Sequence, residues 1–155
     1  MEINMRKIWS MHLKDNRENG KNIDSDEKFN TCKMHNILAI GWQDCDTDDT
    51  YAYKKAYNAL KKMSKGDLVW VKNPQKQEYY VCEILNDKMI DFDKELAAFD
   101  VSTGRIAEFH RVDEKDLPKD KIPFPRQTIQ QIRMKPENYN LIMETILLFE
   151  RISEN

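Results

Sequence analysis

The sequence has few of the residues that interrupt regular structure, with four glycines and five prolines among 155 residues. This composition is ordinary for a folded protein and excludes low-complexity and collagen-like chains. No apolar run approaches the roughly 20 residues that a membrane-spanning helix needs. The polar start, Met1 to Lys7, is not followed by the apolar segment of a signal peptide. We therefore expect one cytoplasmic domain over residues 1–155, with no membrane partner.

Cysteine and net charge are also limited. The three cysteines, at positions 32, 45 and 82, are an odd number without regular spacing. This pattern favours reduced thiols over a disulfide framework. The formal net charge of −2 provides no general attraction to nucleic acid or to an anionic membrane. Any binding of nucleic acid must therefore depend on a local basic surface.

Signatures of common enzymes are absent from the sequence. It contains no P-loop, G-x-S-x-G, H-E-x-x-H or G-x-G-x-x-G motif and no H-x-E with P-C-x-x-C deaminase signature. Cys32 and His35 are one helical turn apart, but the paired spacings of a zinc site are missing. A pair brought together by folding, such as Cys82 with His110, is left open. We expect no metal, no cofactor and no enzymatic activity.

The run from Ile37 to Trp42 is uncharged in a sequence in which 34% of residues are charged. It predicts a central, buried strand. Trp42 is followed at once by the acidic loop 43–49, and Gly41 leaves room beside the ring for a backbone or a ligand. Trp42 therefore either closes one end of the core or forms the wall of a pocket for a flat ligand.

Periodicity predicts an α+β domain with five or six strands, which we expect to form a small curled β-barrel flanked by helices. Strands are expected at 6–13, 37–42, 67–72, 78–85 and 88–92, and in a last pairing of 97–101 with 105–112 that turns at 102–104. Helices are expected at 25–34, from 48 or 49 to 65 before a left-handed Gly66, and at 126–134. A charged connector, 113–125, precedes the third of these, and a C-terminal amphipathic helix begins at Pro136.

The order of these segments resembles the PUA-like superfamily, in particular EVE-type and YTH-like domains. The segments that carry the resemblance are a first strand with a Trp, the strand end Ile-Gly-Trp, Met-Ser-Lys-Gly-Asp-Leu-Val, Tyr-Tyr-Val-Cys-Glu-Ile and a late His-Arg-Val. The chain is also similar to the N-terminal specificity domains of modification-dependent restriction proteins. The resemblance covers roughly Lys7 to Ile132.

The resemblance implies a curled barrel that takes a flipped-out, often methylated base into an aromatic pocket. Trp42 matches the position that supplies a wall of the cage in such domains. Gly66 and Asp67 match a structural Gly-Asp pair, and Arg111 matches a basic residue of the closing strand. The acidic loop after Trp42 and the C-terminal helix depart from the family pattern.

A base reader needs flat walls for stacking and cations for the backbone. The candidate walls are Trp9, Trp42, Trp70, Tyr79 and Tyr80. Strand alternation allows only one of the two tyrosines to face a given pocket, and core packing is the commoner role for Trp9 and Trp70. The candidate backbone cations are Lys33, Lys72, Arg105 and Arg111, chosen from a larger group that also contains Lys54, Lys55, Lys61, Lys62, Lys65 and Lys76.

Two main functions follow from these observations, and an enzyme acting on RNA or a nucleotide is a weaker third. The first is a nucleic-acid-binding module that reads a modified base in DNA or RNA, alone or beside a separate nuclease or effector protein. The second is a protein-interaction domain, such as a small inhibitor or adaptor, on the same fold. The Gly-Trp pair favours the first function, whereas the negative charge and the acidic loop favour the second.

Overall fold

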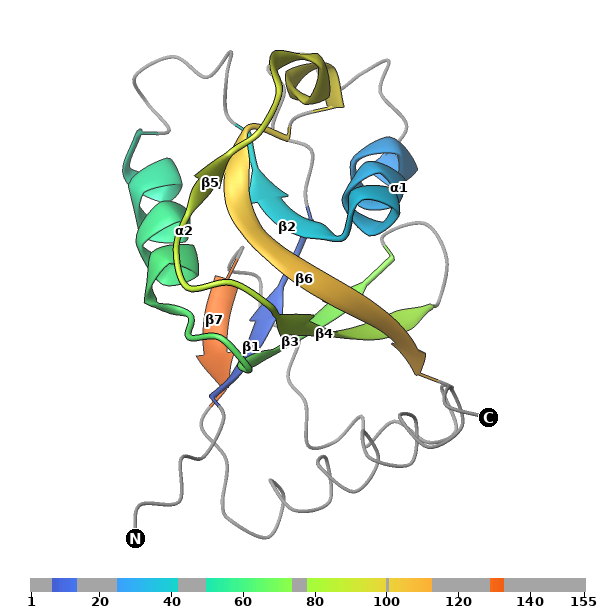
Figure 1. Cartoon of the computed structure of the whole chain (residues 1–155), viewed down its shortest axis with the longest axis vertical. Coiled ribbons are helices and arrows are strands. Elements are labelled where there is room, and N and C mark those ends of the chain that lie inside the picture. Colours follow the sequence, from blue (N-terminus) through green and yellow to red (C-terminus); the bar gives the residue numbers. More distant parts are fainter. Residues whose placement is uncertain are drawn as a thin grey trace, which may run out of the picture.

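The structure is a computed structural model that describes residues 7–13, 25–41, 50–73, 78–99, 101–112 and 129–132. Figure 1 shows the arrangement of its strands and helices. In chain order the elements are β1 (Ile8–Met11), α1 (Ser25–His35), β2 (Ile37–Ile40), α2 (Thr50–Lys62), β3 (Leu68–Lys72), β4 (Tyr79–Ile84), β5 (Ile90–Asp91), the 3-10 helix η2 (Lys94–Phe99), β6 (Thr103–Val112) and β7 (Ile129–Ile132).

The strands form one mixed sheet of seven strands in the order β2-β6-β4-β3-β1-β7, with β5 paired to β6. The long strand β6 joins the two halves, because its first residues pair with β2 and β5 and its later residues pair with β4 (Figure 1). The neighbours β1 and β3 run parallel. The α+β class is as predicted. The sheet has seven strands rather than five or six, and its described strands do not close into a barrel.

Helices α1 and α2 pack against the sheet and supply one main core. Phe29 and Cys32 of α1 and Leu60 of α2 are fully or almost fully buried against alternating strand residues, among them Met11, Val69, Val71, Tyr80, Cys82 and Ile84. The intervening residues of these strands, including Trp70 and Val81, are also buried, although they lie outside this cluster. The central strands are therefore covered on both faces, and β1, which periodicity predicts to be buried on one face, has no exposed face.

Each of the two α-helices in the described ranges is followed by a residue with positive φ. Asn36 has φ +56° at the end of α1, and its amide donates a hydrogen bond of 3.3 Å to the Lys33 carbonyl. Asparagine tolerates this left-handed conformation better than most residues. Gly66 has φ +93°, as predicted for a helix terminator, although α2 ends at Lys62 rather than at Lys65. No helix in the described ranges has the length and apolar character to cross a membrane.

Two predicted elements are wrong. Residues 97–101 are not a strand, because a 3-10 helix occupies Lys94–Phe99 and β6 begins at Thr103, within the predicted turn. Residues 129–132 form a strand, not part of a helix. The spacing of Ile129 and Ile132 is compatible with a helix, but in β7 it places them on opposite faces, both buried. The connector 113–125 and the predicted C-terminal helix lie outside the described residues.

Candidate functional site

Strand β2 leads directly to Trp42, the main candidate for a pocket wall. Gly41, just after β2, is buried, whereas Trp42 and the acidic loop 43–49 lie outside the described residues. The end of β2 is fixed by β6, because Ile40 is the register partner of Thr103 and its carbonyl accepts a hydrogen bond of 3.0 Å from the Ser102 amide. The last residue of β2 is therefore held by β6 through register and a hydrogen bond, and the role of Trp42 stays a prediction.

Gly104 allows the close approach of β6 to β2. A Cβ atom at this position would lie 1.9 Å from the Leu38 carbonyl oxygen and 2.8 Å from the Ala39 Cα. No side chain fits at such distances, so the contact requires glycine. Strand β6, which supports the end of β2, is consequently held against β2 by backbone contact.

The other four candidate pocket walls are buried. Trp9 is 4% exposed, Trp70 0%, Tyr79 7% and Tyr80 2%. Tyr80 belongs to the main core, whereas Tyr79 lies outside it, as strand alternation predicts. Trp70 offers no surface to a ligand in this arrangement, and among the described residues its Nε1 has no hydrogen-bond partner. None of the four presents an open stacking face in this arrangement. Their burial therefore gives no support to a role as pocket walls.

Trp9 is held by Asp67, the acidic residue of the Gly-Asp pair. The Trp9 Nε1 donates a hydrogen bond of 3.1 Å to the Asp67 Oδ2. The same carboxylate accepts hydrogen bonds from the Lys7 amide at 3.1 Å and from the Ser64 amide at 2.9 Å. Asp67 thus ties β1 to the segment that follows α2, which is a structural role.

Tyr80 lies at the centre of an aromatic and charged cluster. Its ring centroid is 5.2 Å from that of Phe29 and 6.2 Å from that of Phe109. The Lys33 Nζ donates a hydrogen bond of 3.1 Å to the Tyr80 hydroxyl, which in turn donates one of 2.9 Å to Glu78. Lys33, expected to contact a nucleic-acid backbone, is therefore also engaged within the protein.

Arg105 was expected to contact the nucleic-acid backbone, but it is a framework residue with no exposed surface. The Nη1 donates to the carbonyl oxygens of Leu60 and Met63, while the Nε and Nη2 donate to the side chain and the carbonyl of Asn86. Burial lowers the pKa of the guanidinium, and the negative charges of Asp87 and Asp67 act in the opposite direction. A phosphate cannot reach this group in the observed arrangement, so the prediction that Arg105 contacts the nucleic-acid backbone is wrong.

The remaining two predicted cations lie on or near the surface. Arg111 is exposed on β6 and is the register partner of Tyr80, which places it on the same face of the sheet as the Tyr80–Lys33 cluster. The Lys72 Nζ lies 5.6 Å from the centroid of the Tyr79 ring. The structure thus brings Lys33 and Arg111 to one region.

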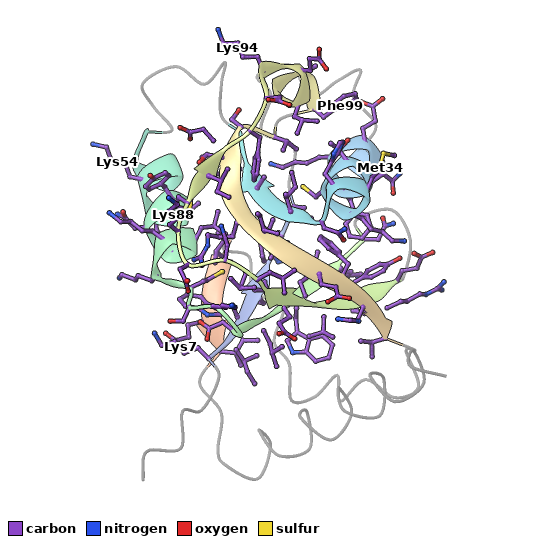
Figure 2. The ribbon with its side chains drawn as sticks, in the orientation of Figure 1. Lys7, Met34, Lys54, Lys88, Lys94 and Phe99 are labelled. Carbon is purple, nitrogen blue, oxygen red and sulfur yellow. The ribbon has the colours of Figure 1, made fainter. Side chains whose placement is uncertain are left out.

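A pocket of about 530 Å³ lies between α2 and the β1–β7 edge of the sheet, and we call it the lysine pocket. The α2 side consists of Lys54, Lys55, Asn58, Ala59 and Lys62, and the sheet side consists of Trp9, Ile129 and Gln131. The register pairs Trp9 with Gln131, and α2 contacts β7. Figure 2 shows Lys54 extending outward from α2. The sequence analysis missed this pocket because it assigned β7 to a helix.

The described residues offer little to a metal or a thiol-based reaction. They contain no group of three or more His, Cys, Asp or Glu residues placed to hold a metal ion. Cys82 is the register partner of Phe109, and His110 is that of Val81, so Cys82 and His110 point to opposite faces of the sheet. This geometry excludes the Cys82–His110 pair. Burial raises the pKa of the Cys82 thiol well above its usual range, and Cys32 adds to the effect.

Comparison with known proteins identifies the fold. No family model and no curated protein matches the chain. Among solved structures, the chain is similar to the YTH domain of the MRB1 protein of Zygosaccharomyces rouxii, determined in complex with N6-methyladenosine RNA. The similarity has a TM-score of 0.51 and 10% sequence identity, and it covers 94% of this chain and 88% of the YTH domain. The chain therefore has a YTH-like fold.

Proposed function

We propose that the protein is a non-enzymatic nucleic-acid-binding module that reads a methylated base, with N6-methyladenine in RNA as the first ligand to test. The observation that supports this proposal is the similarity of fold, over 94% of the chain, to a YTH domain determined with N6-methyladenosine RNA. The identity of 10% carries no residue-level argument, so the site has to be argued from this chain.

In this proposal Trp42 supplies one wall of the base pocket. It follows Gly41 at the end of β2, whose backbone is fixed by β6. Stacking of a base on an aromatic side chain contributes about 1–3 kcal/mol, and a pocket that encloses the methyl group adds the discrimination. Lys33 and Arg111 provide cations beside Tyr80, where they can contact the phosphates.

The test is a titration of the purified protein with short oligonucleotides, followed by intrinsic tryptophan fluorescence. The panel contains single- and double-stranded RNA and DNA, each unmodified, with N6-methyladenine, and with methylated or hydroxymethylated cytosine. Saturable quenching by one modified strand that persists at moderate salt supports a reader and identifies its base. Binding that ignores the modification and disappears with salt indicates phosphate contact alone and contradicts the proposal.

The second candidate is a protein-interaction domain without a nucleic-acid ligand. Two large apolar side chains favour it: Met34 of α1 is 76% exposed and Phe99 of η2 is 36% exposed. They lie on the same side of the molecule, on elements that contact each other (Figure 2). Contiguous exposed apolar patches mark sites of protein contact. The same titration separates the two functions, because this candidate requires no response from any oligonucleotide.

A further inference from the structure

The helix α2 carries a continuous basic stripe. Lys54, Asn58 and Lys62 are spaced four residues apart, and Lys55 lies beside them, so all four fall on one side of the helix. The helix contains no acidic residue. From Lys54 to Lys62 the stripe extends about 12 Å along the helix axis. It therefore presents a row of positive charge rather than a single cation.

The lysines of this stripe are not neutralised by the protein in the described part of the chain. Lys54, Lys55 and Lys62 are exposed, and none of the residues that line the lysine pocket is acidic. No ion pair joins their ammonium groups to a described carboxylate. Like charges this close along a helix repel one another, so an anion bound between them would relieve an unfavourable interaction.

The other residues of the lysine pocket suit a nucleotide. Ala59 of α2 and Ile129 of β7 provide apolar surface, while the side-chain amides of Asn58, within the stripe, and Gln131, on β7, can donate and accept hydrogen bonds. Trp9 contributes little surface, because it is 4% exposed. The volume of about 530 Å³ is within the range of small-molecule sites.

We propose that the lysine pocket binds the phosphate backbone of a single-stranded nucleic acid. The length of the basic stripe selects a strand over a free nucleotide, because three lysines spread over about 12 Å can contact more than one phosphate of a strand, whereas a nucleoside monophosphate carries only one. The inference rests on the proposed function and adds a second region, besides Lys33 and Arg111, on which the backbone of the recognised strand docks.

The experiment compares two triple variants of the full chain. The pocket variant carries Lys54→Gln, Lys55→Gln and Lys62→Gln. The control variant carries Lys61→Gln, Lys88→Gln and Lys94→Gln, which removes the same charge from exposed positions that do not line the pocket. Glutamine has nearly the helix propensity of lysine, and thermal unfolding verifies that both variants fold.

Affinity for a short single-stranded RNA is measured by fluorescence anisotropy over a range of salt concentrations. Each lost phosphate contact lowers the slope of log affinity against log salt by about 0.7 for a single strand. The pocket variant should therefore lose about 2 from this slope, and the control variant should keep the slope of the unaltered protein. Equal slopes in all three proteins would overturn the proposal.

Lysine acetylation followed by mass spectrometry locates the strand directly. Bound RNA should protect Lys54, Lys55 and Lys62 from acetylation and leave Lys61, Lys88 and Lys94 reactive. Equal protection of both groups overturns the proposal. Protection of the pocket lysines by adenosine monophosphate as effectively as by RNA also overturns it, since the site would then belong to a free nucleotide.

The ratio of affinities for methylated and unmodified RNA distinguishes this inference from the proposed function. Backbone contacts are the same in both strands, so the pocket variant should keep the ratio of the unaltered protein. A ratio of one together with the slope change contradicts recognition of a methylated base and supports backbone binding in the lysine pocket. A high ratio without a slope change supports recognition of a methylated base and overturns backbone binding in the lysine pocket. Absence of binding to RNA and DNA overturns both.

Discussion

The Nη1 of Arg105 donates a hydrogen bond of 2.9 Å to the carbonyl oxygen of Leu60 and connects β6 to the last turn of α2. The same nitrogen donates to the Met63 carbonyl just beyond the helix. The last carbonyl groups of a helix have no partner within the helix and carry its partial negative charge. The buried guanidinium of Arg105 provides both a hydrogen-bond donor for these carbonyls and a positive charge beside the negative helix end. It thereby positions α2, and with it the lysine pocket, against the sheet.

Replacement of Arg105 by Met should destabilise the protein. Arg105→Met leaves the Met63 carbonyl without this donor and the Leu60 carbonyl with only the Met63 amide at 3.2 Å, and an unsatisfied buried acceptor costs about 1–3 kcal/mol. We expect the free energy of unfolding in urea to fall by about 3 kcal/mol. Arg111→Met is the matched control because Arg111 is exposed on the same strand, and it should change stability by less than about 0.5 kcal/mol. Similar losses in the two variants would show that Arg105 has no special structural role.

Gly104→Ala tests the close approach of β6 to β2. The added methyl group would collide with the Leu38 carbonyl oxygen, so the strands must separate. Overpacking of this kind typically costs about 1–3 kcal/mol, and backbone that cannot move raises the cost, so we expect about 3 kcal/mol or failure to fold. Thermal unfolding measures the effect.

Gly66→Ala is the comparison for that experiment. Its Cβ would meet no atom within 4 Å, and only the positive φ opposes the change. A left-handed alanine costs about 1–2 kcal/mol. If Gly104→Ala proved as mild as Gly66→Ala, the contact between β6 and β2 would be more adaptable than its geometry indicates.

The raised pKa of Cys82 predicts a loss of stability in alkaline solution. Its thiol stays protonated in the folded protein at pH values at which the unfolded chain, with a thiol pKa of about 8.5, has released the proton. The folded state then binds more protons, so stability falls as the pH rises above about 8.5, by at most about 1.4 kcal/mol per pH unit for this group.

The measurement for Cys82 is urea unfolding at a series of pH values for the unaltered protein and for Cys82→Ala. The variant starts from a lower stability because it has lost buried volume, but its alkaline decline should be shallower. The comparison cancels the titration of lysine and tyrosine side chains common to both proteins. Parallel pH profiles would mean that the Cys82 thiol does not contribute to the decline.

The sequence predicts the elements whose signals are local. The helix Ser25–His35, the β3 and β4 strands, and the left-handed Gly66 all follow from periodicity and helix-end residues in short windows. Strand β7 is different, because it is defined by its pairing with β1, which is distant in the sequence. A short segment with apolar residues three apart satisfies helical and strand patterns equally, and only its partner decides between them.

The candidate site is less predictable for the same reason. The residues next to Arg105 in the sequence give no sign that it is buried. Its burial depends on the distant helix end at Leu60 and Met63, to which it donates hydrogen bonds. Trp9, Trp70 and the two tyrosines are buried because both faces of the sheet are covered, and a pattern read from single strands does not show this. The spacing of Lys54, Asn58 and Lys62 on a helix without acidic residues was visible in the sequence, but the opposite side of the pocket was not.

Trp42→Ala separates the two roles that the sequence allows for this residue. As the wall of a base pocket, Trp42 contributes stacking of about 1–3 kcal/mol, so the variant should bind the methylated strand about 5- to 150-fold more weakly and keep most of its melting temperature. As a core residue, its truncation should cost about 3–5 kcal/mol of stability. Trp42→Phe is the matched variant, because a smaller ring preserves a stacking surface and should recover part of the affinity. Unchanged affinity in a strongly destabilised Trp42→Ala would assign Trp42 to the core and remove the wall on which the proposed reader depends.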